Sequence, residues 1–275
     1  MNNQVVVVTG AGSMGLAIAR RVAQDRTIVL ADINRTNLDA ATTLLTGEGY
    51  RVTTHVVDTS DPASVATLAA DAAALGDVHT LIHTAGVSPN LAPAQKIIAV
   101  DLIGTAHVLE QFGKVIADGG AGVVIASQAG HMGDPLSADL ADALRVTPAA
   151  ELADLEFIAA IDDPGMAYGV AKRANSLRVQ AESVTWADRG ARLNAISPGV
   201  ICTPLAIQEM DGPNRAGYEN MITTSAAGRM GTPTEIAELA ALLLGENGRF
   251  ISGADFLIDG GVIAAIATGR YTLGG

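Results

Sequence analysis

Tyr168 and Lys172 are the residues of this chain whose types and spacing most clearly suggest chemistry. They lie four residues apart in Met166–Ala187, a stretch with helical periodicity. On a helix this spacing brings the lysine ammonium beside the tyrosine phenol. A neighbouring positive charge lowers a phenol pKa toward neutrality, which makes the tyrosine a usable general acid and base. The pair predicts hydride-transfer chemistry if a nicotinamide binds nearby; the alternative is an ordinary amphipathic pair.

A glycine turn indicates where such a nicotinamide cofactor would bind. The segment GAGSMG (Gly10–Gly15) follows the β-branched run Gln4–Thr9 and opens Ser13–Asp25, which has helical periodicity. In a strand-to-helix turn of this kind, the first glycine permits the tight turn and the second lets a pyrophosphate approach the backbone. The third allows the helix to pack closely on the strand. The phosphates then lie at the positive end of the helix.

Asp32 predicts which nicotinamide cofactor is bound. It ends the second expected strand, Thr27–Ala31. A carboxylate at this position accepts hydrogen bonds from both hydroxyls of the adenosine ribose and repels a 2′-phosphate. We therefore expect NAD rather than NADP. Two alternatives stay open, because Arg35 leaves room for a 2′-phosphate and Asp32 could be a solvated residue at a strand end.

The composition fits one α/β domain and argues against several classes of protein. The chain has 275 residues, of which 49% are apolar and 17% charged, so it can bury one large core. No linker, repeat or low-complexity tract divides it, and we expect a single domain over residues 1–275. The net charge of −12 argues against nucleic acid and anionic membranes, because binding phosphates requires clustered Lys and Arg.

Cysteine usage and hydropathy predict a cytoplasmic protein. Cys202 is the only cysteine, which excludes an intrachain disulfide and a cysteine-based metal site, and a reducing compartment fits. We expect no metal. The uncharged stretch Gln4–Ala19 resembles a signal-peptide core but has no basic residue before it, so we expect no targeting segment. No uncharged run reaches the length of a membrane span.

Strands and helices alternate along the chain. Strands are expected at Val5–Thr9, Thr27–Ala31, Arg51–Val57, Thr80–Thr84, Gly122–Ala126, Arg192–Ser197 and Asp255–Ile258. Helices are expected at Ser13–Asp25, Thr36–Gly47, Pro62–Leu75, Ala94–Ala117, Ala167–Asp188 and Thr234–Leu244. Such alternation indicates a doubly wound, parallel seven-stranded sheet with helices on both faces. Ligands then bind at the carboxyl ends of the strands.

Several short segments together resemble the short-chain dehydrogenase/reductase family. In chain order they are TGAGSMG (9–15), Asp58, HTAG (83–86), IASQAG (125–130), YGVAK (168–172), NAISPG (194–199) with Thr203, and IDGG (258–261). Each could occur by chance, but their joint order and spacing, between Val5 and Gly261, are typical of the family. The resemblance implies a single-domain Rossmann fold and an NAD(P)-dependent oxidoreductase that interconverts a secondary alcohol and a ketone.

The resemblance also implies roles for particular residues. Ser127 would hydrogen-bond the substrate oxygen, although it could merely cap a strand end. Tyr168 would transfer the proton, and Lys172 would bind the nicotinamide ribose while depressing the tyrosine pKa. The residues expected to contact the cofactor are Gly10, Gly12, Ser13, Met14, Gly15, Asp32, Ile33, Asp58, Thr59, Thr84, Ala85, Gly86, Tyr168, Lys172, Pro198, Gly199, Val200, Ile201 and Thr203.

Two local departures from the family pattern bear on the mechanism. The glycine pattern is one residue shorter than the family's usual form, so the contacts of the loop are expected to shift. In VDLIG (100–104), Asp101 replaces an asparagine that in the family helps to hold a water in a proton relay through a kinked helix. We count Asp101 among the catalytic residues and expect its charge to alter the pH optimum. His83 and His131 match no family position and are expected to be structural or pocket-lining.

An insertion separates the expected serine and tyrosine. Ser127 and Tyr168 are 41 positions apart, far more than is usual in the family, so residues 133–165 contain extra chain. Leucines alternate there with acidic residues at helical spacing, which predicts two short amphipathic helices broken at Pro148. From their position, these helices would cover the cleft or extend a subunit interface. The alternative is that they form a surface segment without a role in function. As an acidic roof they would favour a neutral, partly apolar alcohol or ketone.

The resemblance further implies a homotetramer. The helices matching Ala94–Ala117 and Ala167–Asp188 would pair across a two-fold axis, and the terminal strand with the apolar tail after Gly261 would form a second interface. The competing function is a non-catalytic dinucleotide-sensing or scaffold protein on the same fold, which would be expected to lack the serine, tyrosine or lysine. An extended epimerase or dehydratase would be longer, and a divergent enoyl reductase would space its tyrosine and lysine more widely.

Overall fold

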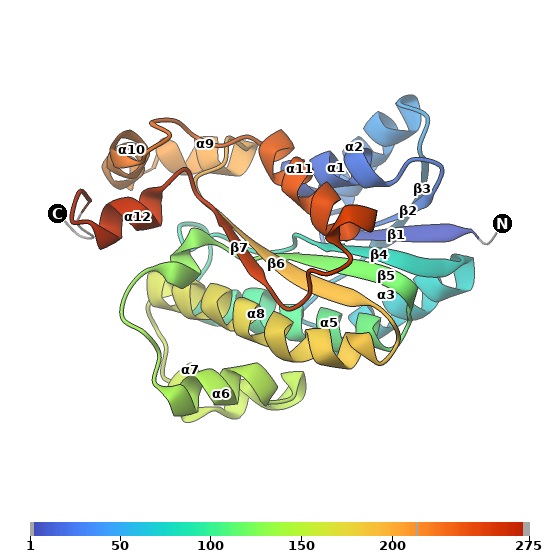
Figure 1. Cartoon of the computed structure of the whole chain (residues 1–275), viewed down its shortest axis with the longest axis horizontal. Coiled ribbons are helices and arrows are strands. Elements are labelled where there is room, and N and C mark those ends of the chain that lie inside the picture. The colour runs from blue at the N-terminus through green and yellow to red at the C-terminus, as the bar shows by residue number, and fades with distance from the viewer. Residues whose placement is uncertain (1–2, 213, 272–275) are drawn as a thin grey trace.

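A single parallel sheet of seven strands forms the centre of the described chain (Figure 1). The computed structural model describes residues 3–212 and 214–271. The strands lie in the order β3-β2-β1-β4-β5-β6-β7, and each neighbouring pair is parallel. They are β1 (Gln4–Thr9), β2 (Thr27–Asp32), β3 (Arg51–Val56), β4 (Asp77–His83), β5 (Ile116–Ile125), β6 (Arg192–Pro198) and β7 (Asp255–Ile258). The order reverses direction between β1 and β4, the point at which doubly wound sheets bind ligands.

Helices cover both faces of the sheet because the strand residues alternate between two apolar layers. Val6 and Val8 of β1 pack in one layer with α1 (Ser13–Val22), α2 (Arg35–Gly47) and α11 (Pro233–Leu244). Val5 and Val7 pack in the other with α3 (Pro62–Leu75), α5 (Thr105–Gly113) and α8 (Pro164–Ala187). Successive side chains of a strand point to opposite faces, so a run of valines is what a strand buried on both faces requires.

Shorter elements connect this framework. They are α4 (Ala94–Ile97), the π-helical turn η1 (Ile98–Gly104), the 3₁₀ turns η2 (Gln128–His131), η3 (Ala149–Asp154) and η4 (Glu246–Gly248), and the helices α6 (Ala138–Val146), α7 (Glu156–Ala159), α9 (Pro204–Met210), α10 (Arg215–Thr224) and α12 (Val262–Ala267). Within the described ranges, no helix has both the length and the apolar character needed to cross a membrane.

The structure confirms the predicted strands and helices, corrects the bounds of several of them and adds helices that were not predicted. All seven strands form. Of the six predicted helices, Pro62–Leu75 keeps its predicted bounds, four others form with shifted ends, and Ala94–Ala117 is divided into α4, η1 and α5. The helix expected over Ala94–Ala117 ends at Gly113, and Ile116 and Ala117 belong to β5 instead. The apolar residues after Gly113 continue the helical pattern, and an apolar run alone does not distinguish a helix from a buried strand. The helices α9, α10 and α12 were not predicted.

The insertion forms helices, as predicted, but it does not roof the cleft. Its elements α6, η3 and α7 pack on η1, α5 and α8, on the side of the molecule away from α9 and α10 (Figure 1). Leu144, Leu152 and Ile158 are buried there against small residues of α8 such as Ala171. The prediction of a lid was wrong because an amphipathic pattern shows that a helix has a buried face and does not show which surface it covers.

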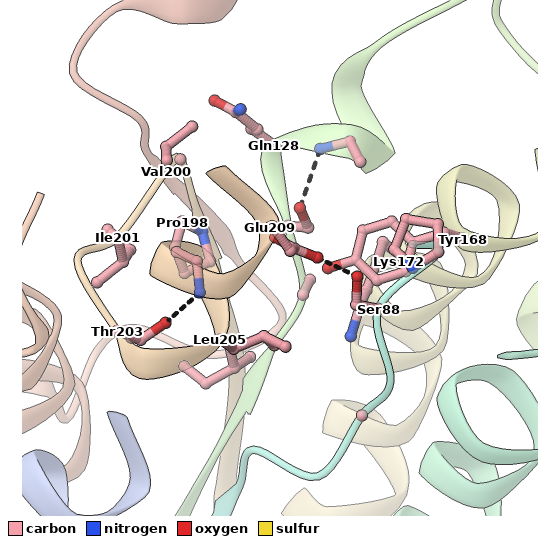
Figure 2. A pocket seen from close by; sticks show the side chains of 18 of the residues that line it. Ser88, Gln128, Tyr168, Lys172, Pro198, Val200, Ile201, Thr203, Leu205 and Glu209 are labelled. Carbon is pink, nitrogen blue, oxygen red and sulfur yellow. Dashed lines mark hydrogen bonds between the residues drawn. The ribbon is translucent and has the colours of Figure 1, made fainter. Parts of the chain in front are cut away.

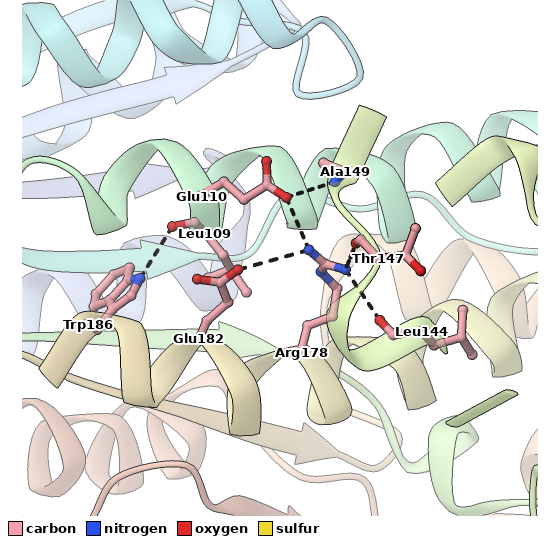
Figure 3. A network of polar contacts seen from close by, with 8 residues as sticks. All are labelled: Leu109, Glu110, Leu144, Thr147, Ala149, Arg178, Glu182 and Trp186. Carbon is pink, nitrogen blue, oxygen red and sulfur yellow. Dashed lines mark hydrogen bonds and ion pairs between the residues drawn. The ribbon is translucent and has the colours of Figure 1, made fainter. Parts of the chain in front are cut away.

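A buried arginine fastens the insertion to the framework (Figure 3). Arg178 of α8, only 2% exposed, donates to the Thr147 carbonyl at 2.6 Å and to Glu110 of α5 at 3.2 Å. The same Glu110 oxygen accepts from the Ala149 amide at 2.7 Å. The insertion therefore covers outer surface of α5 and α8. The pairing of these two helices across a two-fold axis stays a prediction, and the surface that the insertion covers is not available to it.

Candidate active site

A cavity of about 340 Å³ opens at the carboxyl ends of the central strands. Many of the residues predicted from the sequence line it, although they come from distant parts of the chain. They are Met14, Thr84, Gly86, Asp101, Ser127, Tyr168, Lys172, Pro198, Gly199, Val200, Ile201 and Thr203. The topology explains this convergence, because the carboxyl ends of neighbouring parallel strands meet at one edge of the sheet.

The first turns of α8 hold Tyr168 and Lys172. Pro164 occupies the start of the helix and the Asp163 carboxylate accepts from the Met166 amide, so the helix begins with a satisfied cap. The Lys172 Nζ lies 5.3 Å from the centroid of the Tyr168 ring. The structure thus confirms that the four-residue spacing brings the ammonium beside the phenol.

Ser127 joins this pair from the end of β5. Its Oγ accepts from the Ala129 amide at 3.1 Å, so the serine does cap η2. It also lies near enough to the Tyr168 hydroxyl to act on that group's pKa by hydrogen bonding. The capping role and a place in the site are therefore compatible.

Asp101 is buried in the π-helical turn η1 and contacts Lys172 directly. Its Oδ2 lies 3.0 Å from the Lys172 Nζ, and its Oδ1 accepts from the Val87 amide at 2.8 Å. Gly86 makes this contact possible, because a Cβ there would lie 3.0 Å from Asp101 Oδ2 and 3.3 Å from Lys172 Nζ. Single π turns within α-helices are frequent at functional sites, and this one turns a fully buried carboxylate toward the lysine.

The charges around Tyr168 correct one expectation. Burial raises the pKa of Tyr168 above its ordinary value; Lys172 opposes this rise, and Asp101 adds to it. Lysine therefore acts in the predicted direction, but the net shift is upward. Burial by itself would lower the pKa of Lys172, yet Asp101 and Tyr168 raise it, so the lysine is held as a cation. A buried carboxylate offsets the lysine's effect on the phenol, which an asparagine could not do.

The glycine turn has the shape expected of a phosphate-binding loop. Gly10 adopts φ +96°, and a Cβ there would lie 2.7 Å from the Ala85 amide nitrogen. At Gly15, a Cβ would lie 2.5 Å from the Gly10 carbonyl oxygen, whereas nothing lies within 4 Å of a Cβ at Gly12. The turn is packed at its first and third glycines and open at the second, as close approach of a pyrophosphate requires.

Asp32 fastens this turn to the end of β2. Its Oδ2 accepts from the Ala11 amide and its Oδ1 from the Asn34 amide, both at 2.8 Å. Each carboxylate oxygen keeps a further lone pair for an external donor. At the end of β3, Asp58 accepts from the amide and hydroxyl of Ser60. The predicted cofactor residues that do not line the cavity itself are Gly10, Gly12, Ser13, Gly15, Asp32, Ile33, Asp58, Thr59 and Ala85.

Comparison with known proteins decides the family. A family model described as short chain dehydrogenase matches residues 4–139, and one described as enoyl-(acyl carrier protein) reductase matches residues 153–263. The short-chain dehydrogenase/reductase bsc3 of Alternaria brassicicola is 36% identical over 269 residues, which are 97% of this chain and 98% of the relative. This chain belongs to the short-chain dehydrogenase/reductase family. It is accordingly an oxidoreductase.

Further relatives of this short-chain dehydrogenase/reductase are similar over nearly the whole chain. D-threitol dehydrogenase of Mycolicibacterium smegmatis is 31% identical over 95% of this chain and 93% of its own. The crystal structure of levodione reductase is 26% identical, with a TM-score of 0.75 over 95% of this chain and 98% of that one. The two family models leave residues 140–152 unmatched, and this gap falls within the insertion.

Sequence reasoning missed the residues that cover the cavity of this family member. They come from α9 and α10 and from the loop after β4: Val87, Ser88, Pro89, Leu205, Ala206, Glu209, Tyr218 and Met221. A signal for α9 was present, because Thr203 precedes Pro204 and its Oγ1 accepts from the Ala206 amide at 3.2 Å. Thr203 is thus an N-cap with proline at the first helical position.

The two conspicuous histidines of the enzyme are structural. His83 is buried between the hydroxyls of Thr9 and Thr105, at 2.6 and 3.0 Å, and burial lowers its pKa to about 3. His131 contacts the Asp255 carboxylate at 3.0 Å. Neither lines the cavity. Across residues 3–212 and 214–271, no group of three or more His, Cys, Asp or Glu side chains could hold a metal ion.

Proposed function

We propose that the chain catalyses the NAD-dependent interconversion of a secondary alcohol and a ketone. The observation that carries this proposal is the convergence of Ser127, Tyr168 and Lys172 in one cavity, beside the glycine turn at the carboxyl edge of the sheet. A sensor or scaffold would have no need of this arrangement. D-threitol dehydrogenase and levodione reductase are relatives whose names describe alcohol or ketone chemistry.

Each polar group of the cavity has a proposed part in the reaction. Tyr168 takes the proton of the substrate hydroxyl in oxidation and returns it in reduction. Ser127 hydrogen-bonds the same oxygen and fixes its position. Lys172 binds the nicotinamide ribose, and Asp101 holds Lys172 in place by their 3.0 Å contact. The nicotinamide, when bound, supplies the site that accepts or donates the hydride.

The residues of the loop suit a dinucleotide, and Asp32 favours NAD. The open space at Gly12 admits a pyrophosphate to the start of α1, where the backbone amides and helix dipole favour negative charge. The Asp32 carboxylate can accept hydrogen bonds from ribose hydroxyls and repels a 2′-phosphate. Asp58 and Thr59 are proposed to hold the adenine end.

We propose a neutral, partly apolar substrate. The grounds are the residues that line the cavity and not the acidic insertion, which lies on another side of the molecule. Apolar side chains of the cavity, Val87, Val200 and Leu205, suit a hydrocarbon part of the substrate. Glu209 in the same cavity disfavours a substrate carboxylate or phosphate by like-charge repulsion. A reducing cytoplasm is the proposed compartment, since it suits the single, exposed Cys202.

The proposal is tested by following NADH formation over a panel of secondary alcohols: sugar alcohols, steroids, cyclic terpenols and hydroxyacyl thioesters. Tyr168→Phe removes the transferable proton, so kcat is expected to fall by at least about a thousandfold, while NADH binding stays near normal. Tyr50→Phe is the matched control, because the Tyr50 hydroxyl donates to the Arg20 carbonyl, outside the cavity. NADH binding without turnover of any alcohol would instead favour a sensing or scaffold function.

A further inference from the structure

A second polar cluster lies in the cavity beside the catalytic tyrosine. The Ser88 hydroxyl donates to one oxygen of the Glu209 carboxylate, and the Tyr218 hydroxyl donates to the other at 3.1 Å. All three residues line the cavity. Figure 2 shows Ser88 and Glu209 next to Tyr168. Glu209 also contributes to raising the pKa of Tyr168, as a negative charge close to the phenol does.

Gln128 adds an unused acceptor to the same cavity. It follows Ser127 directly, lines the cavity and is 6% exposed. Its Nε2 contacts the Met221 sulfur at 3.1 Å, but its Oε1 is buried without a hydrogen-bond partner among the described residues. Figure 2 shows the Gln128 amide directed away from Glu209, so the two side chains do not share one ligand group.

We propose that Glu209 recognises a second hydroxyl of the substrate, which makes the preferred substrate a diol or polyol, or a hydroxyketone in the reverse direction. This inference rests on the proposed function. Two donors leave lone pairs free on the Glu209 carboxylate, and a hydrogen bond to a charged acceptor is stronger than one between neutral groups. Ser88 and Tyr218 hold the carboxylate in position by their hydrogen bonds. A simple alcohol would leave these remaining lone pairs unused.

The chemistry also indicates what this part of the cavity rejects. A ligand carboxylate would meet the Glu209 charge, and the nearest cation that lines the cavity, Lys172, is already paired with Asp101. A hydroxyl or another neutral donor is therefore the group that fits. The apolar side chains Val87 and Leu205 accommodate the hydrocarbon between the two hydroxyls.

The test compares substrates that differ by one hydroxyl. The unmodified enzyme is assayed with NAD on cyclohexanol and on the cis and trans isomers of the 1,2-, 1,3- and 1,4-cyclohexanediols. We expect the best diol to exceed cyclohexanol by at least about tenfold in kcat/KM, because sites built to hydrogen-bond a substrate hydroxyl discriminate strongly against analogues that lack it. In Glu209→Ala this ratio is expected to fall toward one, and in Glu209→Gln to an intermediate value.

The control variant is Glu219→Gln, which changes a glutamate of α10 that pairs with Arg215 outside the cavity and should leave the ratio unchanged. NADH fluorescence verifies that each variant is folded. A ratio near one in the unmodified enzyme, or a ratio that Glu209→Ala leaves unchanged, overturns the inference while the proposed function stands. Failure to oxidise any alcohol, cyclohexanol included, overturns the proposed function itself.

Discussion

At the scale of single residues, Asp101 is the side chain that distinguishes this site. In the proposed mechanism Tyr168 must lose its proton to act as a base in alcohol oxidation, and burial and Asp101 both raise its pKa. Oxidation should therefore increase with pH into the alkaline range, since the phenolate becomes populated only as the pH passes the raised pKa. In the proposed mechanism the same group acts as an acid in ketone reduction, so the rate of reduction should fall at high pH.

Asp101→Asn should move both pH profiles to lower pH. The substitution keeps an acceptor near Lys172 but removes the charge that offsets the ammonium, so Lys172 lowers the Tyr168 pKa more effectively. The measurement is the pH dependence of kcat/KM in each direction. Asp139→Asn, which changes an exposed carboxylate of α6, is the control. Unchanged profiles, or profiles displaced to higher pH, would show that Asp101 does not set the charge balance.

Asp32 supports a second prediction at this scale. We expect kcat/KM with NAD to exceed that with NADP by at least about tenfold, which corresponds to about 1.4 kcal/mol at the transition state. Asp32→Ala should narrow the difference. It should also weaken binding of both cofactors, because the carboxylate accepts from the Ala11 amide of the glycine turn. Equal use of NAD and NADP by the unmodified enzyme would contradict the prediction.

At the scale of elements, the sequence patterns correctly predicted the structural features that depend only on residues close together in the chain. The strand-turn-helix around Gly10 and the side-by-side placement of Tyr168 and Lys172 each follow from a few adjacent residues, and both are confirmed. The contact of Asp101 with Lys172 could not be predicted from spacing, because it depends on a π turn and on the absence of a side chain at Gly86.

The insertion shows that an amphipathic pattern does not identify the surface on which a helix packs. Its leucines required burial, but the surface that receives them is formed by η1, α5 and α8. That surface carries small residues, including Ala171 and Ala174, whose availability is not visible in the insertion's own periodicity. The helices α9 and α10, which cover the cavity, were not predicted because their apolar pattern is weak. Neither helix buries any of its residues fully.

Arg178 tests how firmly the insertion is attached. Arg178→Ala removes its bonds to Leu144, Thr147 and Glu110, and it leaves the partly buried Glu110 carboxylate without its charged partner. We expect the free energy of unfolding to fall by about 2–4 kcal/mol in urea denaturation. Arg215→Ala breaks an exposed pair and should change it by less than about 1 kcal/mol. Similar losses in the two variants would argue against a structural role for the Arg178 network.

At the scale of the whole molecule, the covered face of α5 and α8 changes the expected assembly. The tetramer implied by the family resemblance would use two kinds of interface, and the chain's own insertion covers part of the surface of α5 and α8 that one of them would need. The other would form at β7, the edge strand, where Leu257 and the preceding Phe250 are exposed. Such an edge with apolar side chains favours pairing with a second copy.

We therefore expect a dimer in sedimentation velocity at micromolar concentration, in place of the tetramer implied by the family resemblance. Phe250→Asp should shift the population toward monomer, because it places a charge on the remaining interface. Val146→Asp, which alters an exposed apolar residue at the end of α6, is the control. A tetramer that survives Phe250→Asp would show that the insertion does not prevent pairing through α5 and α8.

The insertion has one further consequence, for how the enzyme behaves on dilution. The elements η1 and α8, which carry Asp101, Tyr168 and Lys172, pack against the chain's own α6 and η3. Where a neighbouring subunit supplies such support, separation of the subunits loosens the site. Here each protomer carries its own support, so the activity per molecule should stay constant when the protein is diluted until its dimers separate.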